Sequence, residues 1–175
     1  MNKLYCRERL ATQKHSYIFE LGVITTFLMT VTEIIKTLNE FVPFSDNDPV
    51  NDNETFFSDL MNDWEKMPGR ENVIPAIFNL MEKFPHADFG SPGPIVHALE
   101  SNGVKFYEVN LHKSLMKKPT PLTVWMYNRI INAENDDRII KGHIERLKLF
   151  GRHPFADEET KKVIKQFLDY QEKRS

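Results

Sequence analysis

The sequence predicts an all-α protein of about eight helices, and three observations support this fold class. Apolar residues recur three and four positions apart along most of the chain, which is the spacing of one helix face. Only 7 of the 175 residues are glycine, whereas long apolar and charged residues are abundant, a composition that favours helices over a turn-rich sheet. No segment alternates apolar and polar residues as a half-buried strand would.

Prolines separate the first three predicted helices. Residues 32–41 form the first, and the TVTE motif at residues 30–33 is a capping box that satisfies free backbone N–H groups at its start. Pro43 stops this helix. The second helix begins near Phe56 and ends before Pro68. The third carries Pro75 in its first turn, where a missing N–H leaves no hydrogen bond unmade.

The remaining five helices are predicted at residues 95–102, 107–118, 122–133, 136–151 and 153–173. Pro94 and Pro121 occupy first-turn positions, and Asn102-Gly103 forms a C-terminal cap. The last helix has acids early and basic residues late, as the helix dipole favours. Successive helices with short connections predict irregular antiparallel pairs, packed in the manner of HEAT or armadillo proteins.

Chain length fits one domain, or one domain with an appendage. We interpret residues 29–175 as a single helical domain and residues 1–28 as an N-terminal extension. The apolar run in that extension is interrupted by Glu20 and is followed by no small-residue cleavage site, which argues against an export signal. Met29, directly before the capping box, offers an alternative start of translation.

Charge and cysteine content limit the classes of partner. The net charge of −2 and the isoelectric point of about 6.3 predict no direct binding to nucleic acid and none to membranes. Cys6 is the single cysteine, which excludes an internal disulfide and a cysteine-based zinc site. A reducing cytoplasm is the simplest location.

The segment Gly90-Ser91-Pro92-Gly93-Pro94 concentrates residues that are frequent in catalytic loops. A phosphate-binding loop directs several backbone N–H groups at the anion, but Pro92 and Pro94 have no N–H. No lysine follows at the Walker spacing, and no strand precedes the segment. We therefore interpret it as a rigid helix start, with Ser91 or Gly93 just before the first turn.

Histidines and nucleophiles give little support for catalysis or metal binding. No two of the six histidines lie three or four residues apart, so no helix offers a pair of metal ligands. We expect no metal and no cofactor. Asp88, His97 and Glu100 are the best catalytic candidates, and they define one alternative function, a small hydrolase.

A second motif places polar side chains on one helix face. Trp125, Asn128, Arg129 and Asn132 lie three, four and seven residues apart, which makes them neighbours on a helix. The asparagines suit hydrogen bonds to adjacent helices, and Arg129 suits an ion pair with an acid. We interpret this motif as a structural polar seam between helices, with a ligand site as the alternative.

The segment from residue 45 to residue 65 contains seven acids and no lysine or arginine. These acids are Asp46, Asp48, Asp52, Glu54, Asp59, Asp63 and Glu65. Like charges at this density need either solvent or a basic partner. The segment is therefore either a solvated loop and helix start or a docking surface for a basic protein, which acids can steer. The spacing does not match a calcium-binding EF-hand.

Two of these motifs resemble those of a known protein family. The Gly90–Pro94 segment and PTPLTVWMYNRIIN at residues 119–132, followed by a charged helix, resemble immunity proteins of contact-dependent growth inhibition, a bacterial toxin–immunity system. The resemblance covers about residues 29–170.

This resemblance implies a cytoplasmic protein that is not an enzyme and that neutralises a cognate toxin domain by binding it. Within that family, the motifs resemble those of the helical partner of an EndoU-type ribonuclease toxin. The motif residues would be scaffold, and the acids between residues 46 and 65 would meet basic groups of a nuclease cleft. Phe56, Phe57 or Trp64 is the expected apolar anchor of that contact. The alternatives are the small hydrolase and a helical adaptor that binds a peptide between helix pairs.

Overall fold

The computed structural model describes residues 29–44, 52–90 and 92–174, and these ranges contain eight α-helices, one short 3-10 helix and no strand. The helices are α2 (Val31–Glu40), α3 (Asn53–Glu65), α4 (Ile74–Lys83), α5 (Pro94–Ser101), α6 (Val104–Lys117), α7 (Pro121–Ala133), α8 (Asp137–Gly151) and α9 (Glu158–Arg174), and the 3-10 helix η1 (Arg70–Val73) precedes α4. The predicted all-α fold is confirmed. The extension 1–28 lies outside the described residues, as do Asp46, Asp48 and Ser91.

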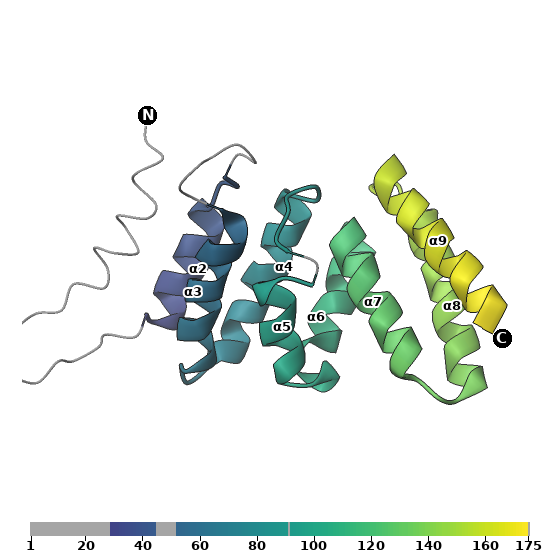
Figure 1. The fold of residues 1–175 in the computed structure, drawn as a ribbon, viewed down its shortest axis with the longest axis horizontal. Coiled ribbons are helices and arrows are strands. Elements are labelled where there is room, and N and C mark those ends of the chain that lie inside the picture. The colour runs from purple at the N-terminus through teal and green to yellow at the C-terminus, as the bar shows by residue number, and fades with distance from the viewer. Residues whose placement is uncertain (1–28, 45–51, 91, 175) are drawn as a thin grey trace, which may run out of the picture.

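The helices stack in a row of two layers, with α2 and α3 at one end and α8 and α9 at the other (Figure 1). Consecutive helices run in opposite directions. Contacts join α2 to α4 and α4 to α6 in one layer, and α3 to α5 and α7 to α9 in the other. This layering places α3, α5, α7 and α9 along one long face, and stacked helical pairs commonly bind partners on such extended faces.

Local capping explains where several helices begin. The Thr30 N–H donates to Glu33 Oε2 (2.7 Å) and the Glu33 N–H donates to Thr30 Oγ1 (3.3 Å), so the predicted capping box is confirmed. Hydrogen bonds from the Thr30 N–H and from its hydroxyl to the Glu33 carboxylate lower the pKa of that carboxyl. A second capping box, which the sequence analysis did not identify, joins Thr120 to Thr123 at the start of α7.

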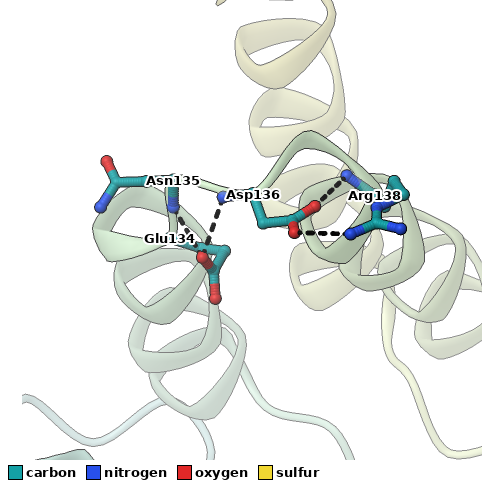
Figure 2. Close-up of polar contacts among 4 residues, drawn as sticks. All are labelled: Glu134, Asn135, Asp136 and Arg138. Atoms are coloured by element: carbon teal, nitrogen blue, oxygen red, sulfur yellow. Dashed lines mark hydrogen bonds and ion pairs between the residues drawn. The ribbon is translucent and has the colours of Figure 1, made fainter.

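The connection between α7 and α8 is fixed by two carboxylates (Figure 2). Glu134 Oε1 accepts hydrogen bonds from the N–H groups of Asn135 (2.7 Å) and Asp136 (3.0 Å). Asp136 is the N-cap of α8, and its Oδ1 accepts from the Arg138 N–H (2.8 Å). The two backbone hydrogen bonds lower the pKa of Glu134, and hydrogen bonds from the Arg138 guanidinium and N–H lower the pKa of Asp136. The predicted start of a helix at Asp136 is therefore correct to one residue.

One continuous cluster of buried apolar side chains runs through the row. At the end built by α2 and α3, the rings of Phe41, Phe56 and Phe57 lie with centroids 4.8 to 5.0 Å apart. At the other end, Tyr127 and Phe150 pack edge to face (5.4 Å between centroids). Aromatic pairs at these separations add to the stabilisation that burial itself provides.

Candidate functional site

The acid at residue 52 has a structural role. Asp52 is the N-cap of α3, and its Oδ1 accepts a hydrogen bond from the Thr55 N–H (2.6 Å). A cap of this kind stabilises a helix by about 1 kcal/mol. The other two acids of this loop, Asp46 and Asp48, lie outside the described residues.

The remaining four acids divide between the two edges of α3. Glu54 and Asp59 are exposed, whereas Asp63 and Glu65 are half-buried. Asp59 and Asp63, four residues apart, share one edge of the helix, and Glu54 and Glu65, three turns apart, share the other. The predicted acidic surface is therefore two separate edges, and the edge with Glu54 and Glu65 faces α5.

The predicted apolar anchor is wrong. Phe57 and Trp64 are completely buried, and only 7% of Phe56 is exposed. The Trp64 ring lies 6.0 Å from that of Phe106, and its Nε1–H donates to the Arg70 carbonyl (2.8 Å). Because these side chains lie on the inner stripe of α3, they hold that helix in the row and cannot fill a pocket of a partner.

A groove of about 480 Å³ lies between α3 and α5. Its lining includes Asn62 and Glu65 of α3 and His97, Glu100 and Ser101 of α5. The Ser101 hydroxyl donates to Glu65 Oε1 (3.1 Å), which ties the two helices together at one end of the groove. Two carboxylates and no lysine or arginine line this acidic groove, so it suits a cationic side chain.

The three residues of the hydrolase alternative do not come together. His97 and Glu100 line the acidic groove, but Asp88 lines a different groove beside α9. Asp88 Oδ1 accepts from the Gly90 N–H (2.8 Å), and Glu100 accepts from Arg129 Nε (2.6 Å) and Nη2 (2.8 Å). Each carboxylate thus holds a structural partner, and the Asp–His pair that a general base needs is not assembled.

The polar residues of α7 form the seam that the sequence predicts. Asn128 Oδ1 (2.9 Å) and Asn132 Oδ1 (2.8 Å) both accept hydrogen bonds from the side-chain amide of Gln171 in α9. Arg129 instead reaches α5, where it binds Glu100, and its guanidinium lies over the Trp125 ring of α7 (4.8 Å to the centroid). The seam therefore fastens α7 to both α5 and α9.

The glycine- and proline-rich loop is also architectural. Pro94 is the first residue of α5, as predicted, and Gly90 has a φ of +88°, which favours glycine. A Cβ atom on Gly93 would lie 1.7 Å from the Phe89 carbonyl oxygen. The loop backbone therefore folds back on itself so closely that no side chain fits at Gly93.

A buried asparagine attaches this loop to the acidic end of the row. Asn53, the first residue of α3, donates from Nδ2 to the Asp88 carbonyl (2.9 Å). Its Oδ1 accepts from the Phe44 N–H (2.9 Å). Because both polar atoms of this buried amide are satisfied by backbone groups, the loop is held in one position relative to α3.

A second groove, of about 370 Å³, lies between this loop, the start of α7 and α9. Apolar side chains provide much of its lining, including Phe89, Leu122, Trp125, Val163 and Phe167. We call it the α7–α9 groove. Sequence reasoning missed it because its walls come from three segments that lie far apart in the chain.

A histidine joins two acids at the rim of the α7–α9 groove. His86 Nε2 lies 3.1 Å from Asp157 Oδ2, and His86 Nδ1 lies 2.9 Å from Glu159 Oε2. Each ring nitrogen of His86 therefore faces a carboxylate oxygen. The contact links the loop to the start of α9.

Charge is distributed unevenly along the row. Residues 29–103 contain thirteen acids and four lysines or arginines, whereas residues 104–175 contain ten acids and fifteen lysines or arginines. The part of the chain that forms α2 to α5 is thus strongly acidic, and the part that forms α6 to α9 is basic. Counting charge by halves of the sequence would have found this asymmetry.

A cluster of ionisable side chains lies buried between α6, α7 and α8. The Tyr127 hydroxyl lies 2.7 Å from His143 Nδ1, and the His112 ring packs edge-on against Tyr127 (5.3 Å between centroids). Burial lowers the pKa of both histidines; Arg146 lowers each further, and Glu108 opposes the shift. Tyr127 is completely buried, so its hydroxyl is not accessible to a substrate.

We expect this cluster to make the free energy of unfolding fall on acidification. The folded-state pKa of His112 and His143 lies below the unfolded value of about 6.5, so the unfolded chain binds more protons. Stability should therefore be constant above about pH 7 and decrease as the pH falls below about 6.5. Urea denaturation at several pH values measures this.

The control is a variant that lacks both titrating rings. In His112→Gln/His143→Gln, the decrease between about pH 7 and about pH 5.5 should be shallower than in the parent protein. Carboxyls with a lowered pKa, such as Asp157, act at lower pH and leave this window unaffected. If the free energy of unfolding falls equally steeply in the double variant, groups other than His112 and His143 cause the decrease.

Neither a metal site nor a similar protein indicates a function. Among the described residues, no group of three histidines, cysteines or acids could hold a metal ion. No helix in the described part of the chain is long and apolar enough to cross a membrane. No protein-family model, curated protein or solved structure matches this chain. Function must therefore be inferred from the grooves and charges of the helical row.

Proposed function

We propose that the protein binds and neutralises a basic protein partner, a cognate toxin domain of the kind expected for the immunity proteins whose motifs it resembles. The acidic groove between α3 and α5 is the observation that carries this proposal. Glu65 and Glu100 present carboxylates there; Arg129, which lies outside the lining, pairs with Glu100, and the lining itself contains no lysine or arginine. Such a groove is complementary to an arginine or lysine on the surface of a partner.

The charge of the surrounding helices supports the same partner class. Residues 29–103 carry a net charge of −9, and a field of one sign raises the rate at which a partner of opposite charge associates. A ribonuclease holds RNA through lysines and arginines that contact phosphate. An acidic face that covers those residues would exclude the RNA.

The two carboxylates of the acidic groove are held in place before a partner arrives. Arg129 fixes both oxygens of Glu100, and Ser101 donates to Glu65. Side chains that are already ordered lose less conformational entropy on binding. The polar seam of α7 thus serves the proposed function by positioning Glu100.

Reversing the charge of the groove edge should weaken binding. The variant Glu54→Lys/Glu65→Lys retains the Glu100–Arg129 pair and removes two negative charges from one edge of α3. We expect its affinity for the cognate toxin domain to fall at least about tenfold, mainly through slower association, with a smaller dependence on salt. Co-expression with a panel of toxin domains, scored by growth rescue, identifies the partner, and surface plasmon resonance at two salt concentrations measures the effect.

A single charge reversal at the basic end provides the control. Asp169→Lys changes an exposed acid of α9 that lines neither groove. This control should retain both rescue and affinity. If the α3 variant is folded and binds the toxin domain as tightly as the parent protein does, the acidic groove is not the interface.

A further inference from the structure

The two grooves are neighbours separated by one ion pair. Glu100 lines the acidic groove, and Trp125 lines the α7–α9 groove. Arg129 connects them, because it binds Glu100 through two hydrogen bonds and stacks on Trp125. A segment of a bound partner that leaves the acidic groove across the Glu100–Arg129 ion pair would reach the α7–α9 groove directly.

The lining of the α7–α9 groove combines apolar surface with negative charge. Trp125 and Phe167 are partly exposed aromatic rings, and prolines of the loop and of α7 add further apolar surface. Asp88 is exposed at the groove and is oriented by the Gly90 N–H (2.8 Å). No lysine or arginine lines the groove, and its histidine, His86, is already paired with two acids.

The size of this groove limits what it can hold. A volume of about 370 Å³ is near the lower end for ligand sites, which span about 300–1,000 Å³. It accommodates a few side chains and not a whole helix. Grooves lined by aromatic and proline side chains bind extended, proline-containing segments, whose backbone is already ordered.

We propose that the α7–α9 groove binds an extended segment of the partner in which a proline or aliphatic residue lies next to a lysine or arginine. The apolar residue contacts Trp125 and Phe167, and the cation pairs with Asp88. The segment belongs to the same partner that fills the acidic groove, so this inference rests on the proposed function. The Asp88 carboxylate disfavours an anionic ligand, because like charges repel.

Four synthetic peptides of equal length test this assignment. The first contains Arg-Pro-Leu-Pro in a Gly/Ser background; the second replaces Arg by Glu; the third replaces Pro-Leu-Pro by Ser-Gly-Ser; and the fourth carries both changes. The chain has two tryptophans, and Trp64 is completely buried, so the indole N–H signal of Trp125 in an NMR spectrum reports on the groove. We expect the first peptide to shift that signal saturably and the other three to bind at least about tenfold more weakly.

Two variants and a control locate the binding. Asp88→Asn keeps an oxygen that accepts from the Gly90 N–H but removes the charge. It should weaken binding of the first peptide about tenfold. Phe167→Ala should weaken it by a similar factor through lost apolar contact. Asp169→Asn changes a residue of α9, the helix of Phe167, that lies outside the groove. This variant should bind the first peptide as the parent protein does.

The outcomes separate this inference from the proposed function. If the first peptide binds and the variants weaken its binding, but the protein rescues growth from no toxin domain, the groove assignment stands and the proposed function fails. If the α3 charge reversal abolishes toxin binding but Asp88→Asn and Phe167→Ala bind the toxin normally, and no peptide shifts Trp125, the groove assignment is overturned. Equal binding of the first and third peptides also overturns it, because the apolar residues would then contribute nothing.

Discussion

Replacing Gly93 with alanine should destabilise the protein by about 3 kcal/mol, because the added methyl group has no space. Its Cβ would lie 1.7 Å from the Phe89 carbonyl oxygen and 2.9 Å from the Gly90 Cα. Both obstacles are backbone atoms, which cannot rotate away as a flexible side chain would. The loop would have to open, and the opening would disturb the start of α5 and the wall of the α7–α9 groove. Urea denaturation followed by far-ultraviolet circular dichroism measures the loss.

Two other glycines distinguish a steric clash from the ordinary effects of removing glycine. Gly142, in the middle of α8, has open space around it, and Gly142→Ala should be neutral or stabilising by about 0.5 kcal/mol. Gly103 also has open space but a φ of +81° and a ψ of 155°, a conformation essentially restricted to glycine, so Gly103→Ala should cost about 2 kcal/mol of backbone strain. If Gly93→Ala costs no more than Gly103→Ala, the loop can relax, and the close approach does not determine its shape.

Helix starts marked by a cap or a proline were predicted well. The capping box at Thr30, the helix start at Asp136 and the first-turn prolines at residues 94 and 121 all lie within one residue of where expected, whereas the starts predicted near Phe56, Tyr107 and His153 lie at Asn53, Val104 and Glu158. Each of these signals acts within one helical turn, so a single sequence contains the whole interaction.

The two grooves could not be predicted in the same way, because the contacts around them join distant parts of the chain. Glu100 and Arg129 are 29 positions apart, and Gln171 and Asn128 are 43 positions apart. Spacing indicated that Arg129 would find an acid, but it did not indicate which acid. Only the packing order of the helices brings Glu100 to Arg129 and so places the two grooves next to each other.

The error at α3 came from assigning one set of residues to two incompatible roles. The periodicity that predicts an amphipathic helix also places Phe56, Phe57 and Trp64 on a single stripe, and such a stripe packs into the core. A partner anchor must instead be exposed before binding. The acids and the aromatics were both assigned to a partner, although the helical period directs the aromatics inward.

Replacing Trp64 with alanine should therefore reduce the free energy of unfolding by about 4 kcal/mol, the cost of a large cavity in a packed core. The side chain is completely buried, and its loss also removes the donor to the Arg70 carbonyl. Arg70 in turn lies over the Phe106 ring and hydrogen-bonds Asn102 at the end of α5. The cavity would thus disturb the support at one end of the acidic groove. Equilibrium denaturation measures the loss.

A conservative variant separates the core role of Trp64 from an anchoring role. Trp64→Phe keeps an aromatic ring in the core and should cost less than Trp64→Ala, about 1 to 2 kcal/mol. Because the ring is not exposed, the folded variant should bind the partner with the affinity of the parent protein. An exposed control, Val42→Ala, should change stability by less than about 0.5 kcal/mol. A stable Trp64→Phe protein that binds the partner tenfold more weakly would mean that α3 turns its aromatic stripe outward in the complex, and the buried position of Trp64 would then describe only the unbound state.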